Sequence, residues 1–112
     1  MLIKKIKLEN IRSYSNQEFE FPQGSILLSG DIGSGKSSIL LAIDFVLFGL
    51  RKDSLSGNAL LRNGTNSGLV ELHFQIEDND IIIQRRLKRS INNSVSQDYG
   101  FISINGNKKE VK

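Results

Sequence analysis

The segment that decides the fold is Gly30-Asp31-Ile32-Gly33-Ser34-Gly35-Lys36-Ser37, which has the residue spacing of a phosphate-binding loop. Its glycines let successive backbone N–H groups curl around phosphate oxygens. In such a loop the lysine, here Lys36, reaches the β- and γ-phosphates, and the hydroxyl that follows, here Ser37, ligates a magnesium ion. The motif therefore predicts a site for a nucleotide and Mg²⁺, with Lys36 as its catalytic residue.

The residues on both sides of this loop supply the context that it requires. Residues 25–29 (Ser-Ile-Leu-Leu-Ser) are typical of a buried strand, and residues 36–48 are apolar over the length of a helix, with Gly49 suited to its C-cap. The helix would point the positive end of its dipole at the phosphates. Because it is apolar on nearly every side, we expect it to be buried between layers. The alternative is a Gly/Ser turn that carries a lysine by chance.

Alternating apolar residues predict further strands along the chain. We expect strands at residues 2–8, 17–21, 69–76, 81–87 and 101–104, turns at 22–24 and 79–80, and polar loops at 50–68 and 90–98. A phosphate-loop strand and helix among these strands indicate the α/β class.

Composition limits the classes of protein that the chain can belong to. With 112 residues it is one domain or part of one, and it is small for a complete P-loop ATPase. No apolar run approaches the roughly 20 residues of a membrane span, and the N-terminus has no signal-peptide pattern, so we expect no membrane partner and a cytoplasmic location. The absence of cysteine excludes disulfides, thiolate metal sites and cysteine nucleophiles.

The net charge of +3 is small, but the basic residues are grouped. Three lysines fall on the first expected strand, and four basic residues fall on a later one: Lys4, Lys5 and Lys7, then Arg85, Arg86, Lys88 and Arg89. Solvated strand faces would explain both groups, and so would contacts to a nucleic-acid backbone. Strict alternation would send Arg85 and Arg89 to one face of the strand and Arg86 and Lys88 to the other.

Two other patterns are interpreted as structural. Residues 39–44 (Ile-Leu-Leu-Ala-Ile-Asp) match a Walker B strand, but they lie too close to Lys36 for a separate strand, so Asp44 is predicted to be a carboxylate on the helix surface or at its cap. His73 is the single histidine and has no second histidine or thiol with which to share a metal ion. We therefore expect it to be an ordinary strand residue.

Several segments together resemble the N-terminal part of the SbcC and Rad-fifty DNA-repair ATPases, which belong to the SMC-like branch of the ABC ATPases. The resemblance lies in residues 7–14 (Lys-Leu-Glu-Asn-Ile-Arg-Ser-Tyr), the phosphate loop, residues 37–43 with the ending 47–49, and the strand pair at 70–74 and 82–86. The Asn-Ile-Arg-Ser element and the loop with its helix are the specific parts, because a bare phosphate loop fits many NTPases.

This resemblance implies a domain organisation. Residues 1–112 would be the N-terminal, Walker A lobe of an ABC-type ATPase head, with an antiparallel β-portion beside the P-loop strand and helix. The coiled coil and the C-terminal lobe would be absent. That lobe carries the signature motif, the Walker B carboxylates and the switch histidine in the family, so the chain is expected to be a fragment or one half of a split pair.

The resemblance also assigns roles to residues. The nucleotide would be held by Gly30, Asp31, Ile32, Gly33, Ser34, Gly35, Lys36, Ser37 and Ser38, and Ser37 would bind magnesium. Arg12 and Ser13 would approach the phosphates from a neighbouring loop, and Leu61, Arg62 and Asn63 would flank the adenine. The family usually has asparagine where this chain has Ile32, a departure that concerns the finer phosphate contacts and not the loop itself.

The family's function implies the partners. ATP would clamp two heads into a dimer, and hydrolysis would release them, which gates a nuclease of the SbcD or Mre-eleven type on double-stranded DNA ends. The C-terminal lobe, a second head, the nuclease and DNA are therefore the expected partners. A head of the RecF, RecN or SMC type is the nearest alternative, followed by a small self-contained P-loop NTPase or kinase, or by an interaction module that needs no nucleotide.

Overall fold

The fold is that of a computed structural model, which describes residues 2–12, 14–21, 36–49 and 60–111. The predicted turn at 22–24, the predicted strand at 25–29 and most of the predicted loop at 50–68 lie outside these residues. The described elements are β1 (Leu2–Ile11), β2 (Tyr14–Glu20), α1 (Lys36–Phe48), β3 (Ser67–Ile76), β4 (Asn79–Arg89), β5 (Val95–Ile104) and β6 (Asn107–Val111).

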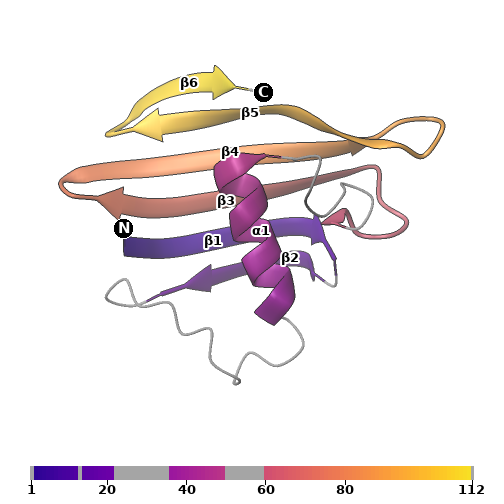
Figure 1. Ribbon diagram of the computed structural model, residues 1–112, viewed down its shortest axis with the longest axis horizontal. Coiled ribbons are helices and arrows are strands. Elements are labelled where there is room, and N and C mark those ends of the chain that lie inside the picture. The colour runs from indigo at the N-terminus through magenta and orange to yellow at the C-terminus, as the bar shows by residue number, and fades with distance from the viewer. Residues whose placement is uncertain (1, 13, 22–35, 50–59, 112) are drawn as a thin grey trace.

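The strands form one antiparallel sheet with the order β2-β1-β3-β4-β5-β6 (Figure 1). Strands β3 to β6 follow one another along the chain and in the sheet, as a meander. β1 joins this meander by pairing with β3, so that Leu8 lies opposite Val70. A strand from the start of the chain therefore lies inside the sheet, between the edge strand β2 and β3.

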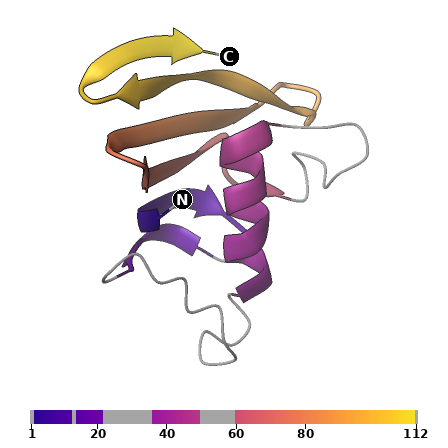
Figure 2. The same cartoon turned by 60° about the vertical axis from the view of Figure 1, so that its left-hand side comes forward.

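Helix α1 lies across one face of the sheet, and Figure 2 shows it standing clear of the strands as a second layer. Its bounds are those that the sequence predicts. Gly49 ends it as expected, with φ of 77° and an N–H that donates to the Phe45 carbonyl oxygen at 2.7 Å. This left-handed cap is a common way to end a helix, and glycine adopts it without steric cost.

The core lies between α1 and the strands that it crosses. Alternate residues of each strand face the helix, because successive side chains of a strand point to opposite faces. The buried apolar residues at the centre of this layer are Ile6, Leu8, Val70, Leu72 and Leu87 from the sheet and Ile39, Ala42, Phe45 and Val46 from the helix. Their burial fixes which face of α1 meets the sheet.

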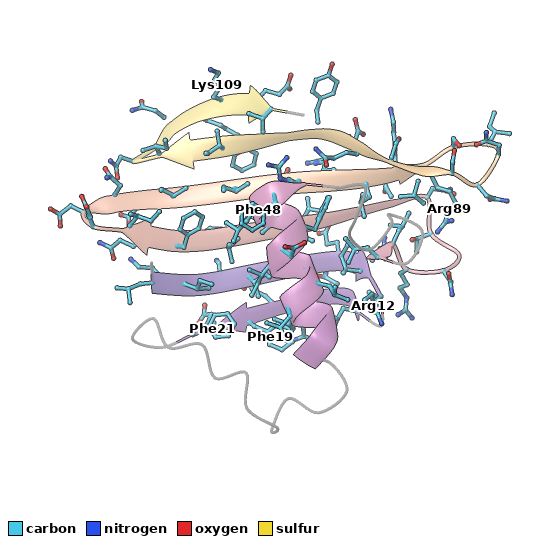
Figure 3. The ribbon with its side chains drawn as sticks, viewed as in Figure 1. Arg12, Phe19, Phe21, Phe48, Arg89 and Lys109 are labelled. Atoms are coloured by element: carbon cyan, nitrogen blue, oxygen red, sulfur yellow. The ribbon has the colours of Figure 1, made fainter. Side chains whose placement is uncertain are left out.

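The sequence predicts that α1 is buried between layers, whereas the described residues form a layer on one side of it only. Leu40 and Phe48, on the other side, are 47% and 61% exposed. Figure 3 shows Phe48 at the end of the helix that lies over β4. The outer side of α1 therefore leaves these two apolar side chains exposed in the described part of the chain.

Three predictions about the strands are wrong. The β3–β4 turn is at residues 77–78, not 79–80, and Asn79 and Asp80 belong to β4. The predicted polar loop at 90–98 is shorter, because residues 95–98 pair with β4 from Arg86 to Arg89. β6 is absent from the prediction. Backbone pairing with a neighbour holds these polar segments in the sheet, without help from an apolar pattern.

The predicted antiparallel β-portion is confirmed, because the described residues form a mostly antiparallel β architecture with α1 as its helical layer. The predicted α/β class depends on the phosphate-loop strand, which lies outside the described residues. No helix among the described residues is long and apolar enough to cross a membrane.

Candidate nucleotide-binding site

The predicted phosphate-binding loop leads directly into α1. Lys36, Ser37 and Ser38 form the first turn of the helix, whereas residues 30–35 and Ser13 lie outside the described part. The first turn contains no acidic residue that would neutralise the positive end of the helix dipole. The backbone and the sequence at the start of α1 therefore both favour the binding of an anion.

Arg12 comes from the turn in which β1 leads into β2, as Figure 3 shows. The last part of β1 is irregular, since Asn10 and Arg12 have left-handed φ values of 54° and 51°. The Asn10 side-chain amide donates to the Ser67 carbonyl oxygen at 2.9 Å and ties this irregular end to β3. Short polar residues such as asparagine tolerate this backbone region, which helps to set the direction of the chain at Arg12.

Residues 60–62 cross the same end of β1. Ile11 forms a β-bridge with Leu61, and the Arg12 N–H donates to the Leu60 carbonyl oxygen at 2.9 Å. The Arg62 N–H donates to the Asn10 carbonyl oxygen at 2.8 Å, and its guanidinium donates to the Arg12 carbonyl oxygen at 3.2 Å. The structure therefore brings Arg12 and Arg62 together, although they are far apart in the sequence.

The three residues expected near the adenine have different surroundings. Leu61 is 2% exposed and its side chain belongs to the core. Arg62 is half-buried and Asn63 is exposed. Of these three residues, only Arg62 and Asn63 present side chains at the surface. Arg12 and Arg62 together give this end of β1 a local positive charge, which favours phosphate.

The face of the sheet opposite α1 carries a polar network that sequence reasoning missed. The Gln84 amide donates to Glu71 at 2.9 Å, the Arg86 Nε donates to Gln84 at 3.0 Å, and His73 Nε2 lies 2.8 Å from the second Glu71 oxygen. The cross-strand register, with Glu71 opposite Gln84 and Lys7, brings these groups together. This network is tertiary, so no local pattern could reveal it.

Glu71 is the titrating centre of this network. Burial alone would raise its pKa, but hydrogen bonds from His73 and Gln84 and the charges of His73 and Lys7 outweigh burial, so the pKa of Glu71 lies below its ordinary value of 4.5. His73 is a strand residue, as predicted, with Glu71 as its partner. Asp44 lies within α1, and not in a Walker B strand. The described residues contain no group of three or more acidic, histidine or cysteine side chains that could hold a metal ion.

Comparison with known proteins places the chain in a family. Residues 5–112 match the family described as AAA domain, which is nearly the whole chain. The chain belongs to the AAA domain family. This AAA domain is 40% identical over 86 residues to the DNA double-strand break repair Rad50 ATPase of Methanococcus maripaludis and 36% identical over 86 residues to that of Archaeoglobus fulgidus. These relatives confirm the resemblance to the Rad-fifty ATPases.

Both alignments include 77% of this chain, but they cover only 9% and 10% of the two relatives. The chain thus spans about a tenth of the length of the curated relatives that it matches. Among solved structures, the recombination mediator RecF with ATP aligns with 98% of this chain and 28% of that chain, at a TM-score of 0.62 and 20% identity. This likeness concerns the fold alone.

Proposed function

We propose that this AAA domain is the ATP-binding N-terminal lobe of a Rad50-like ATPase head. The observation that carries the proposal is the glycine-rich motif that runs directly into the first turn of α1 at Lys36 and Ser37. In this proposal the loop from Gly30 to Ser38 holds the phosphates, Ser37 binds Mg²⁺, and Arg12 approaches the phosphates from β1. Identity of 40% over 86 residues to a Rad50 ATPase supports the Rad50 type, whereas the likeness to RecF concerns the fold alone.

The uncovered side of α1 supports the further proposal that a second lobe completes the head. Leu40 and Phe48 are apolar, and about half or more of each side chain is exposed to water. Contact between this apolar surface and water is unfavourable, and its burial would stabilise the protein. A C-terminal lobe of the same ATPase would cover them. A complete head would then dimerise on ATP and act with a nuclease on DNA ends.

The test of the proposal is the substitution Lys36→Ala. Removal of a charge-assisted bond to phosphate costs about 1.5–3 kcal/mol, or roughly a tenfold to hundredfold loss of affinity. Titration calorimetry with Mg-ATP measures this loss. The matched control is Lys4→Ala, since the Lys4 side chain is exposed and pairs with Asp80 at 3.4 Å. Equal affinities of the wild type and Lys36→Ala would contradict the proposed site.

A further inference from the structure

One arginine connects the far end of α1 with the sheet. The Arg85 Nε donates a hydrogen bond of 2.8 Å to the carbonyl oxygen of Val46, in the last turn of the helix. The last four carbonyls of a helix lack intrahelical partners, and this end of the dipole favours a cation. The sequence of α1 contributes no basic residue to its own last turn. β4 therefore supplies the cation from outside.

Two glycines shape the space around this arginine. A Cβ atom on Gly49 would lie 2.9 Å from the Gln97 Oε1 and 3.4 Å from the Arg85 Nη1. On the other side, β4 and β5 shift register between Gln84 and Arg86, and a Cβ atom on Gly100 would collide with the main chain of Gln84 and lie 3.1 Å from the Arg85 Cα. Glycine at both positions lets the helix end and β5 approach Arg85 closely.

An apolar residue at position 85 would avoid the free-energy cost of burying a charge. Arg85 is half-buried on the helix side of β4, between Ile83 and Leu87, and burial lowers the pKa of its guanidinium, which nevertheless stays charged. Burial of a cation costs free energy, whereas burial of an aliphatic side chain does not. A directional bond, unlike apolar packing, specifies one position of the helix on the sheet.

We propose that Arg85 is a positioning residue, which fixes the C-terminal end of α1 on β4 and so sets where α1 presents the phosphate-binding loop. A helix of 13 residues is about 20 Å long, so a small tilt or slide at Val46 displaces Lys36 relative to Arg12. This inference rests on the proposed nucleotide site. It adds a residue that does not touch the nucleotide.

The experiment compares two arginines of the same strand. Arg85→Met keeps the aliphatic stem and removes the donor. The control Arg89→Met removes a matched bond, in which Arg89 Nε donates to the Thr65 carbonyl oxygen at 2.9 Å, outside α1. For each variant we would measure the affinities for Mg-ATP and adenosine by calorimetry, the urea midpoint, and amide hydrogen exchange of residues 40–44. Arg85→Lys, whose ammonium can also reach a carbonyl, is the conservative variant.

We expect Arg85→Met to weaken Mg-ATP binding about fivefold or more, to leave adenosine binding within twofold, and to speed exchange in residues 40–44. Arg89→Met should lower the urea midpoint without these effects, and Arg85→Lys should restore part of the affinity. If Arg85→Met lost equal affinity for Mg-ATP and adenosine, or if Arg89→Met lost as much affinity for Mg-ATP, Arg85 would contribute to stability only. If the wild type itself fails to bind Mg-ATP, the proposed function is wrong. Unchanged hydrogen exchange in Arg85→Met would separately overturn the attachment of α1 by Arg85.

Discussion

At the scale of single residues, Arg12 shows how the backbone can prepare a binding group. Its φ of 51° is unusual for a residue other than glycine. Its N–H is bonded to the Leu60 carbonyl oxygen, and its own carbonyl oxygen accepts from Arg62. Strained backbone that is held on both sides is common at binding sites. The proposed role of Arg12 toward phosphate is consistent with this constraint.

We expect Arg12→Ala to weaken Mg-ATP binding about tenfold to hundredfold and adenosine binding by less than twofold, because ATP carries phosphates that a guanidinium can bind and adenosine carries none. Calorimetry with both ligands measures the difference. Arg12→Gly removes the same side chain and accepts the left-handed backbone, so it should give the same selective loss. A loss shared equally by ATP and adenosine would indicate general destabilisation.

Glu71 gives a prediction about pH. Because its pKa is depressed in the folded protein, its ionised form contributes stability above the unfolded-state pKa, and this contribution is lost as the pH falls through the lower folded-state value. The free energy of unfolding of the wild type, from urea titrations at pH 7, 5 and 3.5, should fall more steeply below pH 5 than that of Glu71→Gln. Parallel pH profiles of the two proteins would show that the network around Glu71 adds no linkage.

At the scale of elements, the basic residues on the two faces of β4 have different surroundings. Arg85 and Arg89 point toward α1 and the loop before β3, where each bonds a main-chain carbonyl oxygen. Arg86 and Lys88 lie on the opposite face, opposite Leu69 and Ser67 of β3. The predicted alternation is therefore confirmed. Of the four basic residues at 85–89, only Arg86 and Lys88 therefore remain as candidates for contacts with a DNA backbone on the face of the sheet opposite α1.

We expect the double substitution Arg86→Ala and Lys88→Ala in the complete ATPase head to lower DNA affinity. It should also reduce the slope of log affinity against log salt by close to one unit for each phosphate that the protein no longer neutralises. Fluorescence anisotropy with a duplex across a salt series measures this slope. Arg89→Ala is the control from the same strand, and its slope should match that of the wild type. An unchanged slope in the double variant would assign Arg86 and Lys88 to ordinary solvated surface.

The sequence predicts elements whose signal is local, and it misses those that depend on a neighbour. The bounds of α1 follow from a continuous apolar run between a glycine-rich loop and Gly49. β6 is polar and mostly exposed, so it has no buried alternation, and the Asn105-Gly106 turn before it is the one signal that could have revealed it. The proximity of Arg12 and Arg62 depends on tertiary bonds, so only the family resemblance could suggest it.

At the scale of the whole molecule, the described residues form one sheet and one helix with an uncovered apolar surface, and the chain spans about a tenth of its curated relatives. Turnover of ATP needs an acid that holds magnesium and a group that orients water. In our proposal both come from the C-terminal lobe. The signature motif of a second head then completes the site.

We therefore expect the 112-residue chain to bind Mg-ATP but to hydrolyse it negligibly, and a separately expressed C-terminal lobe to restore turnover and ATP-dependent dimerisation. A phosphate-release assay with and without that lobe, together with light scattering for mass, measures both. Substantial hydrolysis by the chain alone that disappears in Lys36→Ala would instead favour a small self-sufficient NTPase.

The strand order has a consequence for the kinetics of folding. The meander from β3 to β6 needs only short turns to close, whereas β1 must reach from position 8 to position 70, with α1 lying between them in the chain. Closing the longer loop costs more chain entropy, and non-local pairing slows folding. β1, which leads into Arg12, therefore joins the sheet after the meander has formed. Under the proposed function, a newly made chain would have the meander from β3 to β6 in place before it could bind a nucleotide.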